Sequence, residues 1–216
     1  MKKINADEFI DVEIPKEIRM LFPKHFQSAY DAVNDLVDET PFLKCPPAIM
    51  AKGHLVAWAI DFSISQLIES GQWRVDYEWS KYARPTGKYL RIYPPKSILT
   101  VSQCQNILEQ PRKAIFRANA AFDNQPRLSL FPKEKDFSEN GKRPALLLLH
   151  GYQKLEFIHI AVPNPARKPA WFGMTNNLLN ELRDVSAELT PTEGPETVSA
   201  PTIKEHLKKQ LRDHAT

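Results

Sequence analysis

Hydrophobic residues recur at helical spacing in two segments of the first third of the chain. In HFQSAYDAVNDLVDE (residues 25–39) the apolar positions follow one another in steps of three and four, which predicts an amphipathic helix that ends at Pro41. The longer segment PPAIMAKGHLVAWAIDFSISQLIESG begins at Pro46 or Pro47 and reaches Gly71. Because proline favours the entry of a helix and glycine its exit, this segment predicts a central helix.

Alternation of apolar and polar residues replaces helical spacing from residue 73 onward. WRVDYEWS (73–80) alternates strictly, which predicts a half-buried strand with an aromatic inner face. KYLRIY (88–93) and SILTVS (97–102) continue the strand pattern, and AIFRANA (114–120) and PRLSLF (126–131) are weaker strand candidates. Helices and strands are thus segregated along the chain. This order predicts an α+β fold with a mostly antiparallel sheet, packed with two N-terminal helices and a further C-terminal helix.

A hairpin is expected within ALLLLHGYQKLEFIHIAV (145–162), where two histidines interrupt apolar strands. A turn of even length centred on Gln153 and Lys154 would pair Leu148 with His159 and place His150 and His159 on one face. Two neighbouring histidines suit an acid/base or phosphate-contacting site, because histidine titrates near neutral pH. The alternative is that both imidazoles fill a sheet that packs under a helix.

A second histidine belongs to a stripe on the predicted central helix. His54, Trp58, Asp61 and Ser65 are spaced by four, three and four residues, so they share one helix face. This face could contribute to a catalytic or metal site if a third group came from the sheet, and its ordinary interpretation is an exposed polar surface. Because neither an H-E-x-x-H motif nor a phosphate loop occurs, the sequence predicts no metal ion and no cofactor.

Basic and aromatic residues alternate in the middle of the chain. Residues 84–135 hold ten lysines and arginines against three acids, whereas the whole chain has a net charge of only +3. Cations neutralise phosphates and exposed aromatic rings stack on unpaired bases, so this mixture suits RNA or a single strand. The residues predicted to bind nucleic acid are Arg84, Lys88, Tyr89, Arg91, Tyr93, Lys96, Arg112, Lys113 and Arg117.

Composition limits the remaining possibilities. The chain has 216 residues, enough for one sizeable domain, and its two cysteines, Cys45 and Cys104, form no metal or disulfide pattern. No apolar run is long enough to span a membrane, and the N-terminus has no secretory pattern, so we expect a cytoplasmic protein with no membrane partner. Residues 1–189 are expected to form one α+β domain. Residues 190–202 read as a disordered linker, and residues 203–216 as a short amphipathic segment.

Three functions are compatible with these patterns. The first is a nucleic-acid-binding protein, for RNA or a single strand, without catalysis of its own. The second is a metal-independent nuclease or toxin-like hydrolase in which His150 and His159 supply acid/base groups. The third is a protein-interaction module in which the acidic N-terminal helix or the C-terminal amphipathic segment docks on a partner. Whether the protein is an enzyme stays open at this point.

Overall fold

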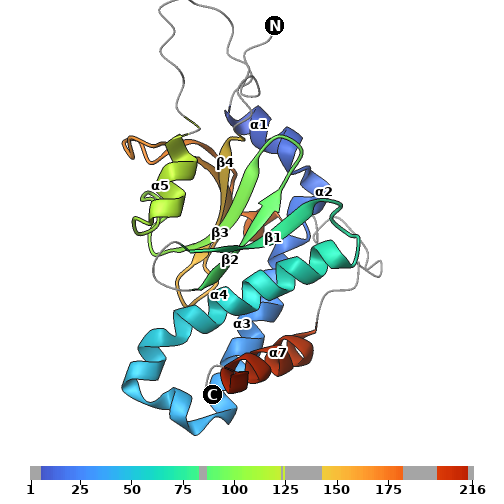
Figure 1. Ribbon diagram of the computed structural model, residues 1–216, viewed down its shortest axis with the longest axis vertical. Coiled ribbons are helices and arrows are strands. Elements are labelled where there is room, and N and C mark those ends of the chain that lie inside the picture. Colours follow the sequence, from blue (N-terminus) through green and yellow to red (C-terminus); the bar gives the residue numbers. More distant parts are fainter. Residues whose placement is uncertain (1–5, 83–86, 123, 125–142, 182–198, 214–216) are drawn as a thin grey trace, which may run out of the picture.

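A computed structural model describes residues 6–82, 87–122, 124, 143–181 and 199–213 (Figure 1). Within this part of the chain, six strands form one sheet in the order of the sequence, and neighbouring strands are antiparallel except for the third and fourth. The predicted α+β class with a mostly antiparallel sheet is confirmed. The strands are β1 (Asp76–Lys81), β2 (Lys88–Tyr93), β3 (Ile98–Cys104), β4 (Ala145–Gly151), β5 (Ile158–Pro163) and β6 (Trp171–Met174).

The N-terminal helices cover one face of the sheet. The two long ones are α3 (Phe22–Glu39) and α4 (Pro46–Glu69), joined by a short 3-10 helix, η1 (Pro41–Lys44), and preceded by α1 (Ala6–Glu13) and α2 (Lys16–Arg19). The predicted helices over 25–39 and 46–71 are therefore confirmed, and the first begins one turn earlier than predicted. Apolar side chains of α3 and α4 form the main core with alternate residues of the central strands, such as Leu99, Leu146 and Leu148.

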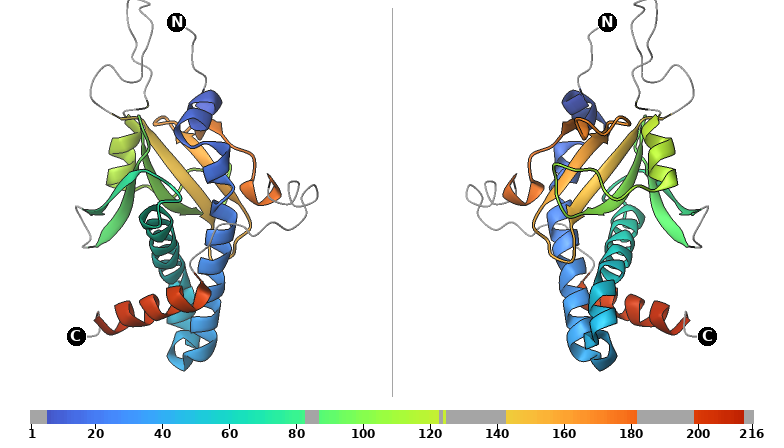
Figure 2. Two further views of the ribbon diagram at one scale, coloured as in Figure 1. Left: turned by 90° about the vertical axis from the view of Figure 1, so that its right-hand side faces the viewer. Right: turned by 90° about the vertical axis from the view of Figure 1, so that its left-hand side faces the viewer.

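A short helix lies on the opposite face of the sheet (Figure 2). This helix, α5 (Ile115–Phe122), belongs to the connection between the parallel strands β3 and β4. The prediction of a strand over 114–120 is wrong. Three alanines in this segment favour a helix, and their small side chains let it lie close against the sheet. The other weak strand candidate, 126–131, lies outside the described residues.

The β4–β5 hairpin has a different register from the predicted one. Leu149 pairs with His159 and His150 pairs with Ile158, so an odd number of residues separates the paired positions. Gln153 adopts a left-handed backbone conformation in the connecting loop, with φ 61°. A Cβ on Gly151 would lie 2.2 Å from the carbonyl oxygen of Lys154. This close approach requires glycine and accommodates the extra residue.

The C-terminal helix packs on the helical hairpin, away from the sheet (Figure 2). This helix, α7 (Ala200–Asp213), begins three residues before the predicted start, and its Ile203 and Leu207 side chains are fully buried against the core. Lys204 and Lys208 form ion pairs with Glu39 of α3. The apolar face predicted to dock on a partner is thus covered by this chain. None of the described helices is long and apolar enough to cross a membrane.

Candidate functional site

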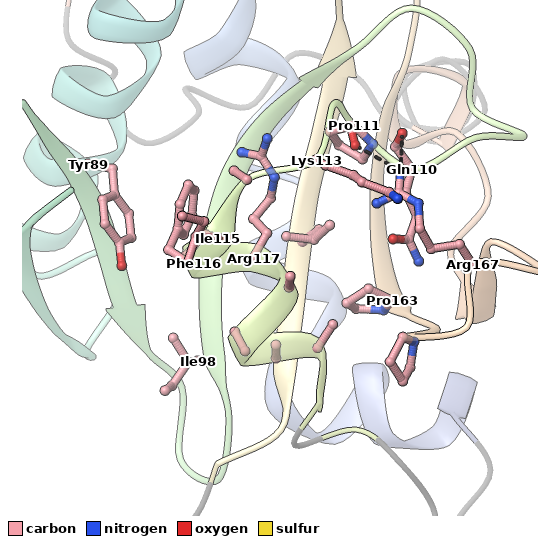
Figure 3. Close-up of a pocket in the computed structure, with 18 of the residues that line it drawn as sticks. Tyr89, Ile98, Gln110, Pro111, Lys113, Ile115, Phe116, Arg117, Pro163 and Arg167 are labelled. Carbon is pink, nitrogen blue, oxygen red and sulfur yellow. Dashed lines mark hydrogen bonds between the residues drawn. The ribbon is translucent and has the colours of Figure 1, made fainter. Parts of the chain in front are cut away.

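A cavity of about 440 Å³ lies between α5 and the sheet face that the long helices leave open (Figure 3). Four of the residues predicted to bind nucleic acid line it: Tyr89, Arg91, Lys113 and Arg117. Its apolar floor comes from alanines of α5 and from side chains of β3 to β5, including Leu147. The fold therefore brings together residues from two separate parts of the basic segment.

The described lining of this cavity contains cations and no carboxylate. The cationic side chains are those of Arg91, Lys113, Arg117 and Arg167, and Arg112 lies next to Lys113 in the chain. We call these five residues the α5 basic surface. Arg91 is the member with a carboxylate partner among the described residues, because its Nη1 lies 3.2 Å from Oε1 of Glu78. The other four present positive charge that no described carboxylate neutralises in a salt bridge.

Two of these arginines are held by consecutive backbone carbonyls. Arg117 donates from Nη2 to the carbonyl oxygen of Arg112 at 2.6 Å. Arg167 donates to the carbonyl oxygens of Gln110 at 3.2 Å and Pro111 at 3.1 Å. Burial lowers the pKa of the Arg117 guanidinium, and repulsion from Arg167 lowers it further. The two guanidinium groups thus lie close enough to repel each other, and both are hydrogen-bonded to the backbone of residues 110–112.

The aromatic part of the predicted interface is organised differently from the expectation. Tyr89 is only 6% exposed, and its ring lies 4.8 Å from the ring of Tyr82 and 4.3 Å from that of Phe116. The ring is therefore packed within the protein, and Tyr89 is not free to stack on a base. Instead, this aromatic cluster anchors α5 to the β1–β2 hairpin.

The remaining predicted residues lie apart from the cavity. Lys88 is exposed at the start of β2, opposite Lys81, and Lys96 is exposed in the β2–β3 turn. Tyr93 lines a shallow hollow, where the Arg143 guanidinium carbon lies 5.5 Å from its ring centroid. Arg84 lies outside the described residues. The predicted set is thus divided between the α5 basic surface and separate exposed positions.

The two hairpin histidines lie on opposite faces of the sheet, because the register differs from the predicted one by a single residue. His150 faces α3, where its Nδ1 lies 2.8 Å from the hydroxyl of Tyr30, and burial lowers its pKa to about 3. His159 faces the other way and contacts the carbonyl oxygen of Thr175 at 2.8 Å. The predicted shared face is wrong, and with it the geometric argument for a paired acid/base site.

The stripe on α4 does not form one uniform surface. His54 and Trp58 are exposed, Ser65 is buried, and Asp61 is partly buried against β2. Burial raises the pKa of the Asp61 carboxyl to about 7, although the backbone N–H of Leu90 donates to it and favours the charged form. Among the described residues, no group of three or more histidine, cysteine or acidic side chains is arranged to hold a metal ion.

Sequence reasoning missed Arg167 and Gln110, which complete the cationic end of the cavity. Gln110 donates from its side chain to the carbonyl oxygens of Asn164 and Ala170, so it ties the segment before α5 to the β5–β6 loop. These residues carry no periodic pattern, and they meet only through the tertiary fold. The basic pair Arg167 and Lys168, flanked by prolines, was the one available signal.

Comparison with known proteins adds no assignment. No family model matches the chain, and searches of curated proteins and of solved structures gave no match.

Proposed function

We propose that the protein binds RNA or another single-stranded nucleic acid through the α5 basic surface, without catalysing a reaction itself. The observation that carries this proposal is the accumulation of cations around the α5 cavity without a carboxylate in its described lining. A buried or half-buried guanidinium is costly unless an anion neutralises it, so the surface favours a negatively charged ligand.

Phosphate contacts account for this surface better than base stacking does. Arginine forks match phosphate oxygens in a bidentate geometry, and Arg117 and Arg167 are already held in place by backbone carbonyls. Tyr89, the ring predicted to stack on bases, is instead packed against Tyr82 and Phe116. We therefore expect binding that depends strongly on salt and weakly on base sequence.

The direct test is fluorescence anisotropy with labelled single-stranded RNA and duplex DNA, at low and at near-physiological salt. The variant Arg112→Glu/Lys113→Glu reverses two exposed charges beside the cavity. The matched control, Lys16→Glu/Lys209→Glu, makes the same change in net charge at exposed positions of α2 and α7. We expect RNA binding that weakens with salt. The first variant should bind more weakly than the wild type, with a salt slope reduced by about 0.7 per lost phosphate contact.

Two results would contradict the proposal. Equal loss of affinity in both double variants would show that net charge, not the α5 basic surface, determines binding. A probe that is cleaved, when the same samples are run on a denaturing gel, would contradict binding without catalysis and return attention to an enzymatic role.

A further inference from the structure

The α5 cavity is apolar toward one end and cationic toward the other, a division that an ordinary basic surface does not require. Its floor is apolar and is built from small and aliphatic side chains, namely Ile98, Ala118, Ala121, Ala145, Leu147 and Pro163. The cations Lys113, Arg117 and Arg167 lie toward the other end, around the segment before α5 (Figure 3). The cavity volume of about 440 Å³ lies within the range of small-ligand sites.

The backbone around Arg167 fixes the position of its side chain. Arg167 has a left-handed conformation with φ 63°, which is unusual for a residue with a Cβ. Asn164 maintains this turn, because its carbonyl oxygen accepts from the Arg167 N–H at 2.9 Å and its side-chain oxygen accepts from the Ala166 N–H at 3.0 Å. These hydrogen bonds hold the backbone of Arg167 in this conformation.

The charge at the cationic end indicates which kind of phosphate it suits. A phosphodiester inside a strand carries one negative charge, whereas a terminal phosphomonoester carries about 1.5 to 2 near neutral pH. Lys113, Arg117 and Arg167 together supply three positive charges. The described residues that line the cavity include no carboxylate to neutralise them. Three cations match a dianion better than they match one internal phosphate.

We propose that the α5 cavity binds the terminal phosphomonoester of a nucleotide, with the phosphate on Lys113, Arg117 and Arg167 and the nucleoside over the apolar floor. The phosphate can belong to the end of a strand or to a free mononucleotide. This inference rests on the proposed function where the ligand is a strand end, and it stands alone where the ligand is a mononucleotide.

The test compares one short RNA prepared with a 5′-phosphate, with a 3′-phosphate, and with hydroxyl groups at both ends. Affinities are measured by anisotropy, and unlabelled AMP is titrated separately by calorimetry. We expect one phosphorylated end to bind about tenfold or more tightly than the hydroxyl form, a difference of about 1.4 kcal/mol. Arg117→Met and Arg167→Met should abolish this preference. Lys113→Met changes an exposed position and should reduce the preference.

Lys88→Met is the control, because Lys88 is exposed on β2 and does not line the cavity. It should leave the preference for a phosphorylated end unchanged. Equal affinity for all three RNAs, together with no AMP binding, would overturn this inference and leave the proposed function standing. AMP binding that Arg117→Met abolishes, without RNA binding, would support the cavity site and overturn the nucleic-acid proposal. A preference that every cavity variant retains would place the phosphate site elsewhere.

Discussion

Replacing His150 by asparagine separates a packing role from a titrating one. His150 is 1% exposed, its Nδ1 lies 2.8 Å from the Tyr30 hydroxyl, and that hydroxyl donates to the carbonyl oxygen of Gly151. The asparagine amide reaches about the same place as Nδ1, so His150→Asn retains a polar partner for Tyr30 while removing the imidazole that gains a proton in acid.

The magnitude follows from the difference in pKa between the folded and unfolded states. Burial lowers the pKa of His150 to about 3, whereas an exposed histidine has a pKa near 6.5. Between these values the unfolded chain binds a proton that the folded chain does not, so stability falls as the pH falls below 6.5. The pH of 5 lies about 1.5 units below the pKa of histidine in the unfolded chain, and this interval corresponds to about 2 kcal/mol of unfolding free energy.

Urea unfolding at pH 8 and at pH 5 measures this contribution. The wild type should lose about 2 kcal/mol more between the two pH values than His150→Asn does, whatever the variant's own stability. His54→Asn is the control, because His54 is exposed on α4, and it should lose as much as the wild type. Equal losses in the wild type and in His150→Asn would refute a buried, neutral His150.

Three further substitutions probe other parts of the fold. Asp61→Asn keeps an acceptor for the Leu90 N–H and removes a carboxyl whose pKa is raised to about 7 by burial. In urea unfolding the variant should therefore gain about 2 to 4 kcal/mol of stability at pH 8, where the wild-type carboxyl is charged, and little at pH 4. Leu207→Ala should cost about 2 to 4 kcal/mol in the same assay, because the Leu207 side chain of α7 is fully buried against the helical hairpin; a loss below about 0.5 kcal/mol would mean that α7 does not dock there. Gly151→Ala should lower the thermal midpoint by several degrees, since its Cβ would meet the Lys154 carbonyl oxygen; an unchanged midpoint would contradict the tight loop.

Hydrophobic periodicity was sufficient to predict the two long helices, α3 and α4, and most of the sheet. The segment 46–71 combined a long apolar pattern with proline at its start and glycine at its end, and α4 runs from Pro46 to Glu69. The strand prediction for 114–120 was wrong because the segment is short, and two apolar residues beside alanines fit a strand and a helix almost equally well. Its helical state depends on the aromatic contacts of Phe116 with Tyr82 and Tyr89, which are distant in sequence.

The hairpin shows why a small error in register matters for a site. The predicted strands were right, but one extra residue in the loop moved His150 and His159 to opposite faces. Loop length was ambiguous in the sequence, because a left-handed Gln153 is not a typical turn residue. Residue types alone therefore located the histidines without predicting whether they could act together.

The candidate site was predicted in part. Charge counting identified the segment that holds Lys113 and Arg117, which lie together at the α5 cavity. It did not identify Arg167, which comes from the β5–β6 loop and approaches through carbonyl contacts with residues 110 and 111. Nor did it show that Tyr89 is covered, because alternation predicts the face of a strand and not what packs on that face.

Photo-crosslinking of RNA that contains 4-thiouridine, followed by mass spectrometry of the crosslinked peptides, tests the central claim most directly. The account predicts crosslinks in the segment around Lys113 and Arg117 and in the loop that carries Arg167. It also predicts their loss in Arg112→Glu/Lys113→Glu and their persistence in Lys16→Glu/Lys209→Glu. Crosslinks confined to α3, α4 or α7, or no crosslink at any salt concentration, would contradict a nucleic-acid interface at the α5 basic surface.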